Sequence, residues 1–213
     1  EVFVSATKGQ EERSRIAEEI AVFSIKDIQN VVPQTSADML SHIPGVKVQK
    51  TQFGGGSPVL RGMEANRILL VVDGVRMNNA IYRKGHLQNS ITIAPSMLDK
   101  TEVLFGPSSV IYGSDALGGV IHYYTRRPQV SERPDVNLDV LMRYGTINNE
   151  NTVSAGVEVQ LKKFASFTNI SHSKFGDLRM GENRPHGFLD WGKQYQFSNN
   201  TDRFYNPEPV DNS

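Results

Sequence analysis

Two stretches in the second half of the chain alternate strictly between apolar and polar side chains. In residues 136–144 every second side chain, starting at Val136, is apolar or aromatic, and residues 153–161 repeat this pattern starting at Val153. Such alternation places the two kinds of side chain on opposite faces of a β-strand. Five consecutive pairs are long for a soluble protein, whose mean strand has about 5–6 residues. We therefore expect two long strands, each with one apolar face.

The connections beside these strands differ in kind. Residues 145–151 form a polar loop, whereas Lys162 and Lys163 form a tight turn into a third strand over residues 164–172. From Phe175 to the end we expect a long loop rich in polar and aromatic residues. Short turns on one side and long loops on the other are typical of outer-membrane barrels. The periodicity by itself fits a soluble β-meander equally well.

The residues before Arg126 differ in composition, because short apolar runs alternate there with glycine-rich turns. We expect a helix over residues 36–42 with Ser36 as its N-cap, and a second short helix over residues 107–111. Asp73 and Gly74 predict a turn inside a hairpin whose first strand is buried on both faces. Residues 16–24 fit either a helix or an edge strand. The remaining expected elements are strands over residues 46–49, 68–72, 75–77, 101–104 and 120–124, and a helical turn over residues 95–98. Short strands and helices that share one small core indicate an α+β domain, which ends near residues 128–135.

The composition excludes several classes of protein and site. The 23 Lys+Arg balance the 23 Asp+Glu, and zero net charge argues against a nucleic-acid partner. Without cysteine the chain has no disulfide framework, no Cys-ligated zinc and no thiol nucleophile. The longest apolar run, residues 68–72, is far shorter than the roughly 18 residues of a membrane-spanning helix, whereas a barrel strand needs only about 9–11 alternating residues. The opening at Glu1 lacks a signal sequence, so we expect any export signal to lie upstream or to have been removed.

No constellation of residues supports catalysis. The glycines at 54–56 lack the order of a phosphate-binding loop, no nucleophile-elbow motif is present, and the five histidines lack the spacing of a metal site. We therefore expect no catalytic residue, no cofactor and no metal site. Asp73 is expected to act as a turn residue. His86, in the polar loop of residues 82–88, is either a solvent-facing histidine or a ligand of haem iron.

Several motifs together resemble the plug domain of a TonB-dependent outer-membrane receptor. They are VLRG at 59–62, ILLVVDG at 68–74, TEVLFGPSSVIYG at 101–113 and ALGGVI at 116–121. Their order and separation are as in that family, and the resemblance covers about residues 1–175. It implies an α+β plug domain over residues 8–130, with a small mixed sheet and short helices, and favours a strand over residues 16–24. It also implies that residues 135–213 form the first antiparallel strands of a transmembrane β-barrel, so that the chain is a fragment of a longer receptor.

The resemblance further implies three groups of functional residues. The opening segment, residues 1–7, is similar to the TonB box, which would bind TonB through Glu1, Val2, Phe3, Val4, Ser5, Ala6 and Thr7. The candidate ligand-binding residues at the plug apex are Phe53, Gly54, Gly55, Gly56, Asn78, Asn79, Tyr82, Arg83 and His86. The candidate plug–barrel contacts are Arg61, Glu102, Arg126 and Arg127.

The function implied by the resemblance is binding and transport rather than bond-making. The receptor would lie in the outer membrane of a Gram-negative cell, contact its lipid, and import a scarce small molecule with energy delivered by TonB and its inner-membrane complex. We expect an iron chelate or haem as the ligand. Two alternatives stay open. A soluble extracellular or periplasmic binding module with a β-meander tail would pack the alternating residues in an ordinary core, and an enzyme would use Asp73 or His86.

Overall fold

The computed structural model describes residues 3–4, 11–12, 19–50, 56–64, 67–77, 88–106, 112–113, 116–176, 193–198 and 203–211. The chain divides into two compact units, one made of Glu1–Leu141 and Ser154–Ser171, the other of Met142–Val153 and His172–Ser213. Across the described ranges, no helix has both the length and the apolar character needed to cross a membrane.

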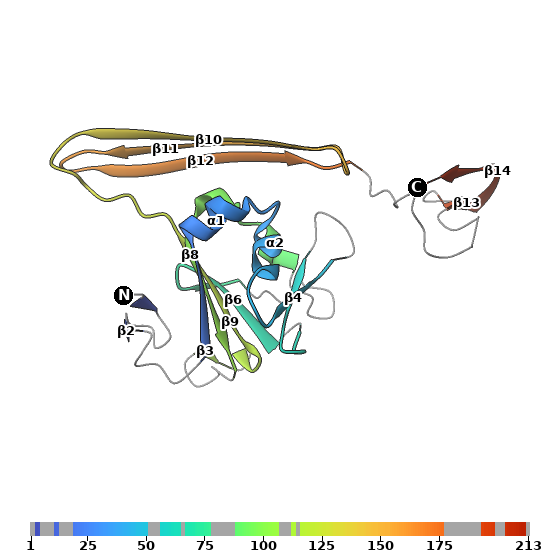
Figure 1. Cartoon of the computed structure of the whole chain (residues 1–213), viewed down its shortest axis with the longest axis horizontal. Helices are drawn as coiled ribbons and strands as arrows, with labels where there is room; N and C mark the ends of the chain where they lie inside the picture. Colours follow the sequence, from blue (N-terminus) through green and yellow to red (C-terminus); the bar gives the residue numbers. More distant parts are fainter. Residues whose placement is uncertain are drawn as a thin grey trace. The chain divides into compact units, whose positions relative to one another are not determined.

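The first unit contains a five-stranded mixed sheet with the strand order β3-β8-β9-β6-β7 (Figure 1). Its strands are β3 (Glu19–Ser24), β8 (Leu98–Phe105), β9 (Gly119–Thr125), β6 (Ile68–Val72) and β7 (Val75–Arg76). All neighbours are antiparallel except β6 and β9, which run parallel. The predicted hairpin is confirmed, since β6 is buried on both faces and meets β7 through Asp73 and Gly74. The strand alternative for residues 16–24 is confirmed over β3.

Two short helices begin at side-chain caps. In α1 (Ile25–Val31) and α2 (Ser36–Ser41), the hydroxyls of Ser24 and Thr35 accept from the backbone N–H three residues later, and the aspartate there accepts from the cap's own N–H. These reciprocal bonds form capping boxes. The prediction that Ser36 caps the second helix is wrong by one residue, because the aspartate that completes the box lies three residues after Thr35.

The five-stranded sheet has a hydrophobic cluster on each face, because successive side chains of a strand point to opposite sides. The helices cover one face with Ile28, Met39 and Leu40, which belong to the larger cluster. This cluster also contains Phe23, Leu70, Val103, Ile121 and Tyr123 from the sheet. The second cluster contains Ile20, Leu69, Val71, Leu104 and Val120. The predicted α+β core is thus present.

Smaller elements complete the part of the chain before residue 126. The strands β4 (Val46–Gln49) and β5 (Ser57–Leu60) form an antiparallel pair, as do β1 (Phe3–Val4) and β2 (Glu11–Glu12). Two 3-10 turns follow, η4 (Gln88–Ile91) and η5 (Pro95–Met97), and η5 confirms the predicted helical turn. The helix predicted for residues 107–111 lies outside the described residues.

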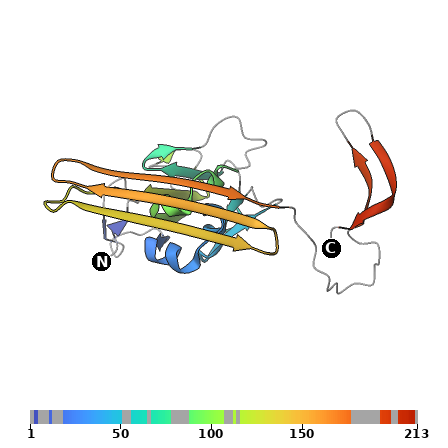
Figure 2. The same cartoon turned by 90° about the horizontal axis from the view of Figure 1, so that it is seen from above.

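Three long strands follow, β10 (Asp135–Gly145), β11 (Glu150–Gln160) and β12 (Ala165–Lys174). They form one sheet in chain order, and Figure 2 shows them side by side with alternating direction. The three strands predicted from alternation and turn spacing are therefore confirmed, with ends that differ from the predicted ones by one to three residues.

The long loop predicted from Phe175 to the end is wrong in part, because β13 (Lys193–Ser198) and β14 (Arg203–Asp211) form an antiparallel pair. Pro207 and Pro209 are unusual in a strand, since proline cannot donate to a ladder. The ladder, however, is irregular at this point, because its partners jump from Val210 opposite Gln194 to Tyr205 opposite Gln196. Both prolines fall inside that irregularity, where no ladder bond is required of them.

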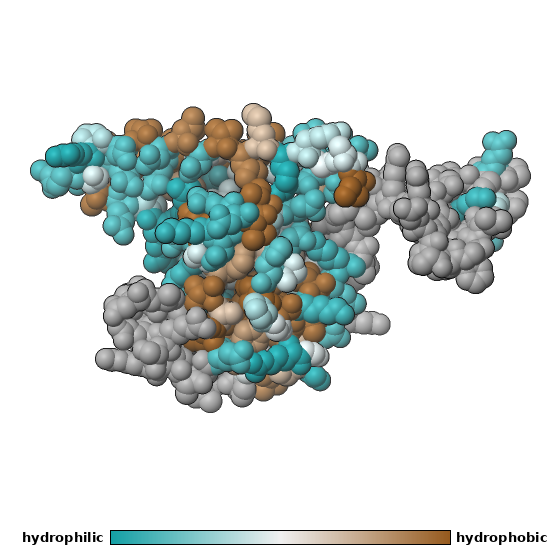
Figure 3. Space-filling model, viewed as in Figure 1, coloured by the Kyte–Doolittle hydropathy of each residue, from teal (hydrophilic) through white to brown (hydrophobic). Residues whose placement is uncertain are grey.

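The long strands expose apolar side chains, and β11 buries polar ones. On β10, Val136, Leu138, Val140 and Met142 are between 57% and 77% exposed, and Figure 3 shows hydrophobic side chains gathered over this strand. On β11, Glu150, Thr152 and Ser154 are 6% exposed or less, whereas Val153 and Val157 are 44% and 38% exposed. A soluble β-meander buries the opposite set. The ordinary core expected for a soluble module is therefore wrong for these strands.

Candidate functional site

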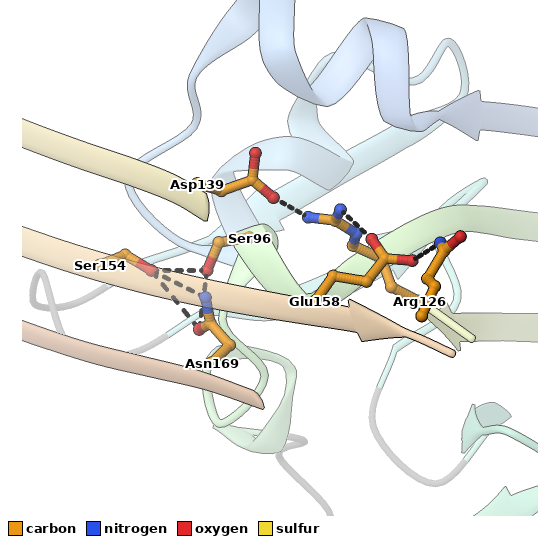
Figure 4. Close-up of polar contacts among 7 residues, drawn as sticks. Ser96, Arg126, Asp139, Ser154, Glu158 and Asn169 are labelled. Atoms are coloured by element: carbon orange, nitrogen blue, oxygen red, sulfur yellow. Dashed lines mark hydrogen bonds and ion pairs between the residues drawn. The ribbon is translucent and has the colours of Figure 1, made fainter. Parts of the chain in front are cut away.

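Arg126 lies directly after β9 and binds side chains of the long strands. Its guanidinium donates to the Asp139 carboxylate on β10 at 2.6 Å and to the Glu158 carboxylate on β11 at 3.1 Å (Figure 4). The guanidinium carbon also lies 4.4 Å from the centre of the Phe167 ring on β12. The guanidinium group is planar and permanently charged, so its N–H groups can donate to two carboxylates while its face lies against an aromatic ring. Arg126 thus joins the end of the five-stranded sheet to three successive strands.

Ser96 on η5 makes a second, uncharged connection to the same strands. Its hydroxyl lies 3.0 Å from the Ser154 hydroxyl and 3.2 Å from the Asn169 side-chain oxygen, and Figure 4 shows the three side chains as one cluster. The Arg126 backbone N–H donates to the Met97 carbonyl at 2.8 Å, next to Ser96 in sequence. The charged and uncharged connections are therefore linked through the backbone.

Asp73 acts as the turn residue that its sequence predicted. Its backbone is left-handed, with φ of 47°, and its carboxylate accepts from the backbone N–H and the hydroxyl of Thr125 at 3.1 and 2.5 Å. Its own N–H donates to the Tyr123 carbonyl at 3.0 Å. These bonds join the turn after β6 to the end of the parallel strand β9. A structural role accounts for every contact of this carboxylate described here.

A chain of polar groups begins at the next residue and crosses one face of the sheet. The Gly74 N–H donates to Nε2 of His122 at 3.1 Å, and Nδ1 of His122 lies 2.9 Å from the Tyr124 hydroxyl. Since Nε2 accepts, we assign the ring proton to Nδ1, which leaves the Tyr124 hydroxyl free to donate to Glu102 at 3.2 Å. Lys100 donates to the other oxygen of the fully buried Glu102 at 2.6 Å. The chain thus satisfies a buried carboxylate and a buried imidazole together.

His122 is held neutral by its surroundings. Burial lowers its pKa from 6.5 to about 4, and the nearby negative charges of Glu102 and Asp73 oppose this effect only in part. The ring also stacks on Tyr124, with ring centres 4.0 Å apart. Because the Gly74 N–H needs an unprotonated nitrogen as acceptor, the neutral ring is the form that fits this site.

The other three residues expected at the plug–barrel boundary have contacts near the five-stranded sheet. Arg61 pairs with Glu19 and lies 4.9 Å from the Phe105 ring. Arg127 is mostly exposed and lies 3.3 Å from the Asp73 carboxylate. Glu102 belongs to the His122 chain. The structure therefore brings Arg126 to the long strands and places these three in other contacts.

Most of the expected ligand-binding and TonB-binding residues lie outside the described residues. Gly56 is described and buried, whereas the other eight apex candidates, including His86, fall in the gaps before and after it. In the opening segment only Phe3 and Val4 are described, and they pair with Glu12 and Glu11. Within the described ranges, no group of three or more acidic or histidine side chains is arranged to hold a metal ion.

The sequence alone did not identify most partners of this site. Asp139 and Glu158 stand at polar positions of the two alternating segments, and their negative charge was an available signal. Ser96, Ser154 and Asn169 carry no such signal, since neutral polar residues are common in strands and turns. His122 and Tyr124 are two residues apart in a strand, which places them on one face, but nothing local predicts Glu102 beside them.

Comparison with known proteins gives one matching family model. The model described as TonB-dependent Receptor Plug Domain matches residues 12–120. Two curated relatives are the vitamin B12 transporters BtuB of Vibrio vulnificus strains CMCP6 and YJ016, which are 32% and 35% identical over 139 and 141 residues. Each alignment covers 64% of this chain, and the chain spans only 22% of the length of these relatives.

Solved structures share the fold. The copper transporter OprC gives a TM-score of 0.64 at 24% identity, over 75% of this chain and 24% of that one. The ferripyoverdine receptor of the outer membrane of Pseudomonas aeruginosa gives a TM-score of 0.64 at 18% identity, over 76% and 20%. The alcaligin outer-membrane receptor FauA of Bordetella pertussis gives 0.62 at 15% identity, over 80% and 29%.

Replacing Arg126 should loosen the end of the five-stranded sheet. Arg126→Ala removes the partner of the half-buried Glu158 and the contact with Phe167, so we expect local stability to fall by about 1–3 kcal/mol. Arg127→Ala, at a mostly exposed arginine, should change it by less than about 1 kcal/mol. Amide hydrogen exchange of residues 119–126 in the full-length receptor measures both. Equal effects of the two variants would contradict the role given to Arg126.

The titration of His122 should occur far below that of an ordinary histidine. Its folded-state pKa is depressed, so the unfolded chain takes up the proton first as pH falls below 6.5, and stability decreases until the folded ring titrates near 4. The slope in this window is at most about 1.4 kcal/mol per pH unit. Exchange of the imidazole C2 proton, followed by mass spectrometry in the full-length receptor, gives the midpoint directly. His122→Gln should remove this part of the slope, and a midpoint near 6.5 would contradict the assignment.

Proposed function

Because this chain belongs to the family of TonB-dependent receptor plug domains, we propose that it forms the plug and the first barrel strands of a receptor that imports a scarce small molecule across the outer membrane of a Gram-negative cell. The observation that carries the proposal is that β10 exposes valine, leucine and methionine, while β11 exposes valine and buries glutamate, threonine and serine. Strands that face lipid outside and a polar interior need this order. The named relatives are transporters and receptors rather than enzymes.

The proposed division of the chain follows from the same elements. Residues 1–7 form a TonB box, residues 8–130 the plug, and residues 135–213 the start of the barrel with its outer loops. Arg126 would then hold the end of the plug against the barrel wall, because it binds acidic side chains on β10 and β11. A barrel wide enough to admit large ligands leaks unless such a plug fills it. Of the remaining candidate contacts, Arg61 and Arg127 would line the plug surface, whereas Glu102 is fully buried in the chain of polar groups around His122.

The ligand we propose is a metal-bearing small molecule. The relatives and neighbours are named for vitamin B12, copper and ferripyoverdine, which share a bound metal ion. An iron chelate or haem, our expectation from the sequence, belongs to the same class. Binding would involve the apex segments around Phe53 to Gly56 and around Asn78 to His86, where aromatic, amide and imidazole groups are concentrated.

Energy for transport would come from TonB and its inner-membrane complex. The described part of the opening segment, Phe3 and Val4, is a strand, and an extended segment can add to the sheet of a partner through its backbone. The TonB box would exist in two states, one docked on the receptor and one released toward the periplasm. Ligand binding would favour the released state, which requires that the receptor in this state bind the ligand more tightly than the receptor with a docked box.

A panel of three probes tests the ligand class. We expect full-length receptor, extracted with detergent, to bind at least one of cyanocobalamin, ferripyoverdine and haem in equilibrium titrations. If haem is bound through His86, His86→Ala should weaken its binding at least tenfold, whereas His42→Ala, at a histidine that ends α2, should leave it unchanged. Binding of none of the three, in a protein that stays soluble without detergent, would contradict the proposed function.

A single proline tests the TonB box. Val4→Pro removes a backbone N–H that strand addition requires, so uptake of the bound probe into cells should fall to background while its binding to purified receptor is unchanged. Val4→Thr keeps the N–H and should transport normally. Normal transport by the proline variant would show that residues 1–7 are not the segment that TonB engages.

A further inference from the structure

Gly156 stands in the middle of β11, where a glycine weakens a strand unless something else requires it. It has no side chain to pack, and its backbone loses more freedom on folding than that of any other residue. Its φ lies outside the left-handed region, so an alanine can adopt the same backbone conformation. The residue is buried, on the face of the strand that carries Ser154 and Glu158. The reason for a glycine therefore lies in what packs against it.

Two side chains of the neighbouring strand β12 occupy the space beside Gly156. A Cβ added at Gly156 would be 3.2 Å from Nδ2 of Asn169 and 3.3 Å from Cε2 of Phe167, closer than such a carbon ordinarily approaches its neighbours. Phe167 and Asn169 are two residues apart, so both project from the same face of β12. The ring and the amide thus lie against the backbone of Gly156, and we call these three residues the platform.

Both connections to the long strands rest on this platform. The guanidinium carbon of Arg126 lies 4.4 Å from the centre of the Phe167 ring. The side-chain oxygen of Asn169 lies 3.2 Å from the Ser96 hydroxyl, and its amide nitrogen donates to the Ser154 hydroxyl at 3.2 Å. Phe167 therefore carries the charged connection, and Asn169 carries the uncharged one.

The partners of these connections on β11 flank Gly156 as well. Ser154, which contacts Ser96 at 3.0 Å, lies two residues before Gly156. Glu158, which accepts from Arg126 at 3.1 Å, lies two residues after it. Alternate residues of a strand share one face, so a side chain at position 156 would stand between the two connections and press on both.

We propose that Gly156 is a positioning residue, because the absence of a side chain there lets one platform receive Arg126 from the end of β9 and Ser96 from η5 at the same time. The steric fit at position 156 then couples the charged connection to the uncharged one. This inference rests on the proposed function, in which the platform belongs to the barrel wall and the two connections hold the end of the plug against it.

Amide hydrogen exchange in the full-length receptor tests the platform. By intrinsic preference alone, Gly156→Ala should stabilise β11 and slow exchange. We expect the opposite near the connections, with exchange at residues 96–98 and 119–126 rising at least threefold, and at least tenfold in the larger Gly156→Val. Val157→Ala, at an exposed residue on the other face of the strand, should change neither segment. Unchanged or slower exchange in both segments of the alanine variant would overturn the inference, and a rise in only one would overturn the shared platform.

A cycle of Arg126→Ala and Ser96→Ala tests the coupling itself. The exchange rate of the double variant should differ at least threefold from the product of the two single changes. The backbone bond from the Arg126 N–H to the Met97 carbonyl also links the two sites, and neither substitution removes it. Repeating the cycle in Gly156→Ala separates the two links, because this background keeps the backbone bond and disturbs the platform, so the effects should become additive. Additivity in the parent receptor, or non-additivity that survives Gly156→Ala, would overturn the role of Gly156.

The platform and the proposed function can fail separately. Exchange that is equal in the parent and in Gly156→Ala would remove the platform and leave the assignment of plug and barrel strands as it is. A receptor that stays soluble without detergent would contradict that assignment, whereas the exchange cycle would still decide whether Gly156 joins the two connections.

Discussion

Polar groups on β10 and β11 need hydrogen-bonding partners, and several of these partners come from residues beside the five-stranded sheet. Glu158 is only 15% exposed, so leaving its carboxylate unpaired would be costly, whereas Asp139 is more than half exposed. Arg126, at the end of β9, supplies a positive charge together with a guanidinium plane for Phe167. Ser96 supplies hydroxyl contacts to Ser154 and Asn169. Side chains that follow or adjoin the five-stranded sheet therefore supply partners to polar groups on these strands.

Buried polar groups on the face of the five-stranded sheet away from its helices also need hydrogen-bonding partners. Lys100, Glu102, His122 and Tyr124 form a connected set there, in which each polar group has a described partner. The neutral state of His122 is a consequence of this arrangement, since a second ring proton would displace the Gly74 N–H. The charges of Lys100 and Glu102 on this face neutralise each other within one ion pair.

Much of the fold could be predicted from the sequence because its signals are local. Strict alternation predicted β10 and β11, and the Asp73–Gly74 pair predicted the turn of the β6–β7 hairpin. The N-cap at Thr35 was missed by one residue because serine and threonine are both good caps and only the position of Asp38 decides between them. The β13–β14 pair was missed because its prolines sit in a ladder irregularity that only the partner strand defines.

The contacts of the candidate site were harder to predict from the sequence than the fold, for a physical reason. Arg126 could be singled out by the resemblance to the receptor family, but its partners lie 13 and 32 residues further on and become neighbours only through the fold. The contacts of Ser96 with Ser154 and Asn169 had no signature at all, since neutral polar residues in turns and strands fit many roles. Long-range contacts between common residue types are what the sequence does not disclose.

The parallel pairing of β6 with β9 has a consequence for how such a chain can diversify. The stretch between these strands, which contains η4, η5 and β8, starts and finishes on two backbones bonded side by side along their whole length. Cleavage of the peptide chain inside residues 78–87 would leave both fragments attached to each other through the sheet. Insertions at that point would also cost little, because the entropy of closing a loop rises only slowly with its length. One scaffold can therefore carry segments of very different size without redesign of its interior.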